Sequence, residues 1–236
     1  MTEVIAHRGL HLTMRENTVE AFAAAVACGV AGIELDARRT ADGAIVVHHD
    51  AYLPDADGDG TRRAIVDCLR TDLPTWLPTI GDALDACAGV WVNIEIKNGP
   101  HEPDFDTTDA VATAVLAHLD DRTEPLDNWL ISSFRRETVE RCRTINPAVA
   151  TAWLTAAPVS PADIEALAAG GHAALHPLEQ TLDAATVGRC HAAGLRVNAW
   201  TCNDPARAAA LAGWGVDGIC TDAPAALLEA LDANAG

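Results

Sequence analysis

Three carboxylates stand where short strand-like runs of the chain come to an end. Glu34 and Asp36 alternate within one such run, and Glu95 lies at the end of another. Carboxylate oxygens with no cysteine among them are the ligands expected for a hard divalent cation, Mg²⁺ or Ca²⁺. Buried carboxylates at adjacent strand ends also need a cation or a proton partner to offset their charge. We therefore predict that these three residues hold one divalent cation.

Two histidines and two basic residues accompany the carboxylates. His7 and Arg8 follow the first strand-like run, His49 comes after the second, and Lys97 closely follows the third carboxylate. Imidazoles exchange protons near neutral pH, and Arg and Lys side chains bind phosphate oxygens. Together with a metal, this set predicts cleavage of a phosphodiester with His7 and His49 on opposite sides of the cation.

Strands and helices that alternate along the whole chain must position these groups. The expected strands are Val4–Ala6, Gly32–Asp36, Trp91–Ile96, Trp129–Ser133, Thr151–Leu154, Ala173–His176, Arg196–Trp200 and Gly218–Thr221. A helical pattern follows each of them, and 236 residues suit eight such units. We therefore predict an α/β fold, a (β/α)8 TIM barrel formed by residues 1–236 as a single domain, with its chemistry at the carboxyl ends of the strands.

A β-hairpin extension is expected after the second strand. Asp42-Gly43 lies between β-branched and alternating residues, which is the sequence signal of a two-residue type I′ turn. Pairing outward from such a turn places Asp36 directly opposite His49, and strand alternation puts Arg38 on the face of the carboxylates. The hairpin is therefore predicted to bring His49 back to the metal ligands.

Several other polar residues are predicted to have structural roles. Asp222 precedes a helix and is expected to cap it, and Glu16 with Asn17 is expected to make capping and loop hydrogen bonds. His11 is grouped with the histidines that have no catalytic role. The acidic stretch 55–63 resembles the start of an EF-hand loop, but the expected bidentate Glu is missing, so we interpret it as a solvated loop.

Net charge and composition exclude several classes of partner. The chain has 34 acidic and 16 basic residues, a net charge of −18, which argues against nucleic acid and against stable association with an anionic membrane. No leader-like or membrane-spanning apolar segment is evident, and seven cysteines without CxxC spacing fit a reducing compartment. We expect a cytoplasmic protein that acts on a small molecule. The oligomeric state is left open.

An ordered series of short motifs carries a family resemblance over nearly the whole chain. The motifs are His7-Arg8-Gly9, Glu16-Asn17-Thr18, Glu34-Leu35-Asp36, Thr40 with Asp42-Gly43, His49-Asp50, Pro78-Thr79, Glu95-Ile96-Lys97, Ser132-Ser133-Phe134 and Ala199-Trp200-Thr201 with Asn203. Each is weak alone, and the ordered set is specific. In order and spacing it resembles the glycerophosphodiester phosphodiesterase family.

The resemblance implies a barrel enzyme that uses a divalent cation to hydrolyse glycerophosphodiesters to glycerol 3-phosphate and an alcohol. It implies that His7 and His49 are the acid–base pair, with His7 favoured as base and His49 as acid. It further implies that Arg8 and Lys97 bind phosphate and that Trp200 lines the glycerol pocket. The metal ligands it implies are the three carboxylates already named.

Some alternatives stay open at this point. One is a lysophospholipase D-like activity on a single-chain lipid, and another is a barrel that binds glycerophosphodiesters without cleaving them. Glu34 and Asp36 could instead form ion pairs with Arg8 or Arg38 that only stabilise the fold. The sequence also does not distinguish direct attack by water from attack by a glycerol hydroxyl. The short, acidic stretch 55–63 departs from many family members, so the leaving alcohol is not predicted.

Overall fold

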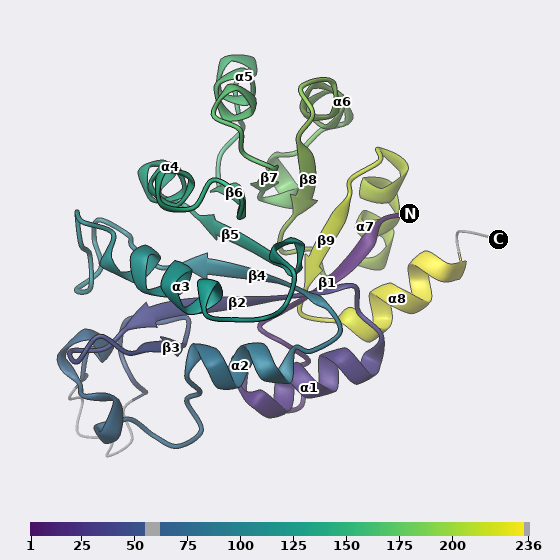
Figure 1. The fold of residues 1–236 in the computed structure, drawn as a ribbon. Helices are drawn as coiled ribbons and strands as arrows, with labels where there is room; N and C mark the ends of the chain where they lie inside the picture. The colour runs from purple at the N-terminus through teal and green to yellow at the C-terminus, as the bar shows by residue number, and fades with distance from the viewer. Residues whose placement is uncertain (55–61, 234–236) are drawn as a thin grey trace.

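A closed sheet of parallel strands forms the centre of the molecule (Figure 1). The computed structural model describes residues 1–54 and 62–233, so most of the predicted loop 55–63 lies outside the described residues. Strand β1 pairs with β9 on one side and with β2 on the other, which closes the barrel. The parallel strands are β1 (Glu3–His7), β2 (Gly32–Arg39), β4 (Trp91–Ile96), β5 (Trp129–Ser133), β6 (Ala150–Thr155), β7 (Ala174–Pro177), β8 (Arg196–Ala199) and β9 (Gly218–Thr221). The predicted TIM barrel is confirmed.

Helices connect the strands and cover the outside of the barrel (Figure 1). Local sequence explains where several begin: Thr18 caps α1, and Ser160 caps α5 with a proline in its first turn. The helices are α1 (Val19–Cys28), α2 (Ile80–Ala86), α3 (Ala110–Asp120), α4 (Arg136–Ile145), α5 (Pro161–Ala169), α6 (Ala184–Ala192), α7 (Pro205–Gly213) and α8 (Pro224–Ala233).

Strand β2 shows how the sequence directs its polar residues inward. All of its residues except the last are buried, so both faces of the strand are covered. Ile33 and Leu35 belong to the main apolar core, whereas Glu34 and Asp36, which alternate with them, lie on the other face, inside the barrel. Each such buried aliphatic side chain stabilises the fold by about 1.5 to 3 kcal/mol. Packing on the outer face thereby fixes the two carboxylates on the inner one.

The hairpin after β2 exists, but its predicted turn and register are wrong by one residue. Strand β3 (Ile45–Val47) pairs antiparallel with β2, with Arg38 opposite Val46. The amide of Thr40 donates to the carbonyl of Ala44, and Gly43 adopts φ +84°, so the turn has three residues and ends on a left-handed glycine. Residue 48, rather than residue 49, therefore lies opposite Asp36.

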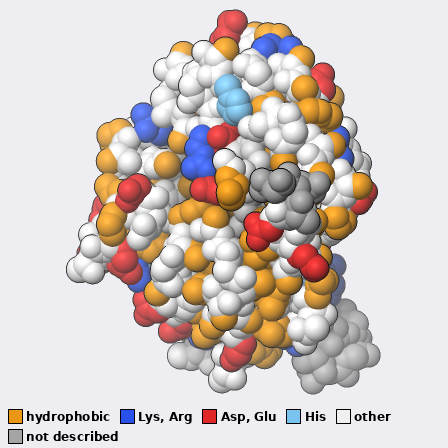
Figure 2. Space-filling view, turned by 90° about the vertical axis from the view of Figure 1, so that its right-hand side faces the viewer, with side chains coloured by type: hydrophobic (Ala, Val, Ile, Leu, Met, Phe, Trp, Pro, Cys, Tyr) orange, Lys and Arg blue, Asp and Glu red, His pale blue; other side chains and the backbone are white. Residues whose placement is uncertain are grey.

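The two ends of the barrel differ in chemistry. Figure 2 views the side that carries the chain termini, away from the carboxyl ends of the strands. A cavity of about 830 Å³ lies at this end between β1, α7 and α8, and its charged lining residues are Glu3, Asp217 and Asp232. It contains no histidine or basic side chain, so it does not have the groups expected for phosphodiester cleavage. No helix among the described residues is long and apolar enough to cross a membrane.

Candidate active site

A smaller cavity, about 190 Å³, opens at the carboxyl ends of the strands and brings together most of the predicted site. Seven of the eight predicted residues line it: His7, Arg8, Glu34, His49, Glu95, Lys97 and Trp200. The eighth, Asp36, is fully buried and lies within 4 Å of both Arg8 and Lys97. Although this cavity is smaller than the one at the other end, its chemistry makes it the candidate active site.

The three carboxylates form one compact cluster. Glu34, Asp36 and Glu95 each offer an oxygen within 4.8 Å of the others, and all three are buried. Strand pairing causes this, since Asp36 is directly opposite Glu95 in the parallel register of β2 and β4. Burial, followed by repulsion from Asp36, raises the pKa of Glu34 well above its ordinary value, and burial also raises the pKa of Glu95.

Two partly buried basic side chains offset part of this negative charge. Lys97 Nζ lies 2.6 Å from Glu95 and 2.9 Å from Asp36, and Arg8 Nε lies 3.3 Å from Asp36. Burial favours a neutral Asp36, but Lys97 and then Arg8 outweigh that effect and hold its pKa well below the usual range. The suggested ion pair of the carboxylates with Arg8 is therefore present at Asp36, whereas Arg38 pairs elsewhere.

The residues present fit a divalent cation. When all three carboxylates are ionised they face only two basic groups, and Arg8 is also shared with Glu16, 3.0 Å away, so the negative charges outnumber the positive ones. One oxygen of Glu34 is buried without any hydrogen-bond partner. Such an oxygen is costly unless a proton or a metal reaches it. The all-oxygen donor set is the one that Mg²⁺ and Ca²⁺ prefer.

Backbone strain places Arg8 at the rim of the carboxylate cluster. Arg8 adopts φ +55°, an uncommon conformation for a side chain of its size. Its amide donates to the main-chain oxygen of Glu34 at 3.0 Å. Gly9 follows at φ +86°, and a Cβ there would come within 2.7 Å of the carbonyl carbon of Ala21, so only glycine fits. The His7-Arg8-Gly9 motif is thus a turn that aims one imidazole and one guanidinium at the cavity.

Asp222 holds His7 in a defined tautomer. His7 Nδ1 lies 2.6 Å from Asp222 Oδ1, while His7 Nε2 lies 3.9 Å from Glu34. Burial opposes ionisation of Asp222, but hydrogen bonds from His11, His7 and Asn203 outweigh it and hold its pKa well below the usual range. Because a carboxylate can only accept a hydrogen bond, the imidazole carries its proton on Nδ1. Nε2 is therefore the basic atom that faces the carboxylates.

The sequence context of Asp222 predicts a helix cap and gives no sign of its contact to His7. Its side chain instead accepts from His7 and from Asn203 Nδ2, the latter at 2.7 Å. Asn203 in turn accepts from the Asp222 amide, so the pair is locked from both sides. The available signal was its position, since Asp222 directly follows β9 at the same barrel end as the other strand-end groups.

His49 reaches the cavity by a route that differs from the predicted one. It lies two residues beyond β3, and Arg38 Nε and Nη2 donate to its main-chain oxygen at 2.8 and 2.6 Å. Arg38 is itself fixed by Glu102 and Asp104. Burial, followed by repulsion from Lys97, lowers the pKa of the His49 imidazole. A buried arginine, rather than strand pairing, therefore positions this histidine.

Glu16 and Asn17 also contact residues of the candidate active site. Thr18 provides the helix cap, Glu16 binds Arg8, and Asn17 Nδ2 donates to Asp36 Oδ2 at 2.7 Å. Glu16 and Asn17 therefore do not have the predicted capping role. They contact the Arg8 guanidinium and the Asp36 carboxylate of the site instead.

Two aromatic rings form the apolar wall of the cavity. The Trp200 indole donates from Nε1 to the main-chain oxygen of His176 at 2.8 Å, which fixes the ring. Phe134 packs edge to face against it, with centroids 5.2 Å apart and planes at 86°. Phe134 also lines the cavity and is 44% exposed. Phe134 belongs to the Ser132-Ser133-Phe134 motif, which by itself predicts no role for the ring.

Comparison with known proteins identifies the family of the chain. Residues 7–226 match the model of the glycerophosphoryl diester phosphodiesterase family. The glycerophosphodiester phosphodiesterase of Caldanaerobacter subterraneus subsp. tengcongensis is 27% identical, with 97% of each chain covered. That of Bacillus altitudinis is 26% identical, with 95% of this chain and 96% of the relative covered. A phosphodiesterase structure from Oleispira antarctica, in complex with the product sn-glycerol-3-phosphate, superposes with TM-score 0.85 at 26% identity, covering 98% and 97% of the chains.

The barrel, the cluster at its carboxyl end and these matches define the class of the protein: it is a phosphoric diester hydrolase on a TIM-barrel fold. Within that class, the chain belongs to the glycerophosphoryl diester phosphodiesterase family.

Proposed function

We propose that the protein hydrolyses glycerophosphodiesters to glycerol 3-phosphate and an alcohol in a metal-dependent reaction, with His7 as general base and His49 as general acid. The observation that carries the proposal is the shared cavity. There His7 and His49 lie beside three buried carboxylates, whose charge the Arg8 and Lys97 side chains offset only in part. The relative from Oleispira antarctica, which was solved with sn-glycerol-3-phosphate, supports the nature of the product.

Glu34, Asp36 and Glu95 would hold one divalent cation, Mg²⁺ or Ca²⁺. When bound, the ion would supply Lewis-acid polarisation of a phosphoryl oxygen. Arg8 and Lys97 face the same cavity and would bind the remaining phosphate oxygens by charge-assisted hydrogen bonds. The Trp200 ring would pack against the glycerol carbons, because it presents a fixed apolar surface there.

The two histidines would move protons in opposite directions. His7 Nε2 has a free lone pair and would take the proton of the attacking oxygen, and Asp222 would stabilise the imidazolium that results. His49 would protonate the leaving alcohol oxygen. An anionic phosphodiester beside its ring favours the charged imidazole, which opposes the burial effect on its pKa.

Product analysis on a substrate panel tests this proposal. Purified protein is incubated with glycerophosphocholine, glycerophosphoethanolamine or glycerophosphoglycerol in the presence of Mg²⁺ or Ca²⁺, and glycerol 3-phosphate is assayed. We expect release from at least one substrate and none after chelation of the metal. If no deacylated phospholipid yields glycerol 3-phosphate with either metal, the proposed activity is wrong.

The Asp222→Asn substitution should lower kcat by about 10- to 100-fold, the value of one hydrogen bond to a charged group. An amide can donate as well as accept, so it no longer forces the Nδ1–H tautomer of His7. Imidazole ¹⁵N NMR should then show that both neutral tautomers of His7 are populated, with the proton on Nδ1 in one and on Nε2 in the other. KM should change little. Asp217→Asn is the matched control, because Asp217 pairs with His191, which lies on α6 away from the cavity. Equal losses in the two variants would contradict the role of Asp222.

A further inference from the structure

His11 has no part in the proposed reaction, yet it faces the residue that orients His7. It lies in the loop between β1 and α1, and its Nε2 is 3.1 Å from Asp222 Oδ1. The same oxygen accepts from His7 Nδ1 at 2.6 Å. The two imidazole rings stand nearly perpendicular, 6.2 Å apart at their centroids. One carboxylate oxygen is therefore shared by two imidazole nitrogens that converge on it.

These three groups are a different kind of ligand set from the carboxylate cluster. One ligand atom each from His7, His11 and Asp222 lies within 4.8 Å of the others. Imidazole nitrogens with one carboxylate oxygen suit zinc, whereas Mg²⁺ and Ca²⁺ prefer oxygen alone. We propose that His7, His11 and Asp222 form a second cation site, selective for zinc, and that zinc bound there inhibits the enzyme by disabling His7 as a base.

The geometry needs only a small adjustment to hold the ion. Tetrahedral zinc with bonds of about 2.0 to 2.1 Å places its ligand atoms about 3.4 Å apart. The two measured nitrogen–oxygen distances are 2.6 and 3.1 Å, so each must lengthen by less than 1 Å. The His11 and Asp222 side chains are 17% and 26% exposed, so zinc can enter from solvent and water can complete the coordination. Asn203 keeps the second Asp222 oxygen in place.

Proton balance explains the inhibition. Zinc must bind the Nδ1 lone pair of His7, so the proton now on Nδ1 leaves to solvent and Nε2 acquires one. His11 changes in the same sense, losing the proton on Nε2 and gaining one on Nδ1. The two neutral imidazoles thus change from one tautomer to the other, and no proton is released overall. The net charge of the site rises by the two positive charges of the zinc ion. With Nε2 protonated, His7 cannot accept a proton from the attacking oxygen, an inference that rests on the proposed function.

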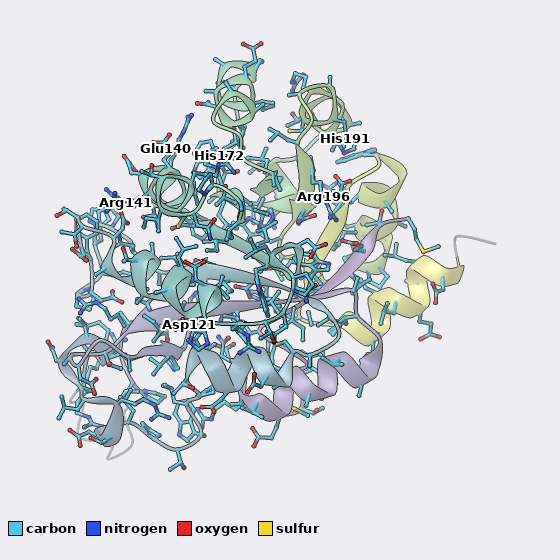
Figure 3. The ribbon with its side chains drawn as sticks, viewed as in Figure 1. Asp121, Glu140, Arg141, His172, His191 and Arg196 are labelled. Carbon is cyan, nitrogen blue, oxygen red and sulfur yellow. The ribbon has the colours of Figure 1, made fainter. Side chains whose placement is uncertain are left out.

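Zinc binding tests the site without reference to activity. The full-length protein is kept in excess Mg²⁺, and zinc affinity is measured by competition with a chelator for wild type, His11→Gln and His191→Gln. Gln can still donate to Asp222 but is a poor zinc ligand. His191 is a second histidine paired with an aspartate, on α6 in the outer helix layer (Figure 3). We expect His11→Gln to bind zinc at least about tenfold more weakly and His191→Gln to match wild type.

Turnover under the same conditions tests the consequence. Zinc should inhibit wild type, and His11→Gln should need at least about tenfold more zinc for the same inhibition while its zinc-free turnover stays near wild type. Inhibition of His11→Gln at the wild-type zinc concentration would overturn the proposal, as would equal zinc affinity in the two proteins. The binding measurement decides the site even if no phosphodiesterase activity is found, so the two proposals fail separately.

Discussion

The His49→Ala substitution is expected to lower kcat on natural glycerophosphodiesters by about 10² to 10⁴, or roughly 2.7 to 5.4 kcal/mol of transition-state stabilisation. The leaving alkoxide is a strong base and needs a proton as the bond to phosphorus breaks. Three histidines among the described residues line the cavity: His7, which Asp222 contacts, His176, whose pKa burial lowers to about 3, and His49. His49 is therefore the histidine left to supply that proton. Metal binding should be retained, because His49 is not one of the clustered carboxylates.

A change of leaving group separates the two histidines. para-Nitrophenolate is a weak base that departs without a proton, so His49→Ala should cleave glycerophospho-para-nitrophenol nearly as fast as wild type does. His7→Ala should lose about 10² or more on both kinds of substrate, because the attacking oxygen still requires a base. If His49→Ala loses as much on the activated ester as on the natural one, His49 is not the acid.

His48→Ala is the matched control for the same loop. The His48 ring packs against Trp76, with the two ring centroids 5.9 Å apart. It does not line the cavity, although it is adjacent in sequence to His49. Its loss should leave kcat within about threefold of wild type, since it removes no group that reaches the substrate. A loss comparable to that of His49→Ala would show that the substitutions act by disturbing the loop.

The carboxylate cluster could be predicted from the sequence because two simple regularities determine it. Alternation along β2 puts Glu34 and Asp36 on one face, and the parallel barrel brings the carboxyl end of β4, with Glu95, next to them. Because Ile33 and Leu35 pack in the apolar core outside the barrel, the face of β2 that carries Glu34 and Asp36 must point into the barrel. Both regularities are local to a strand or common to the whole fold, so no loop geometry is needed.

Positions that depend on loops could not be derived in this way. The location of His49 was right and its explanation wrong, since one extra turn residue shifts the register and Arg38 supplies the contact instead. Asp222 has a sequence context typical of a helix cap, and its contact to His7 joins residues 215 positions apart. A contact over that separation follows from barrel closure between β9 and β1, which fixes neighbours but not side-chain directions.

Replacing a proposed metal ligand should separate function from stability. Glu34→Gln removes a buried carboxyl group whose charged form is disfavoured by burial and by Asp36, and it keeps the size and shape of the side chain. The metal-free protein should therefore be at least as stable as metal-free wild type, because the neighbouring carboxylates repel each other less. Activity should fall by at least about 100-fold at a metal concentration that saturates wild type, because an amide is a weaker ligand than a carboxylate.

Thermal unfolding with and without metal measures both effects of Glu34→Gln. A cation present at 100 times its dissociation constant stabilises wild type by about 2.7 kcal/mol, which for a chain of this size raises Tm by about 5 to 10 °C. The variant should show little of that increase while its metal-free Tm equals or exceeds the wild-type value. Glu16→Gln is the control, since Glu16 contacts Arg8 but lies outside the cluster, and it should keep the metal-induced shift. An undiminished shift in Glu34→Gln would exclude Glu34 as a ligand, whereas a lower metal-free Tm would mean that its charge is already compensated by Arg8 and Lys97.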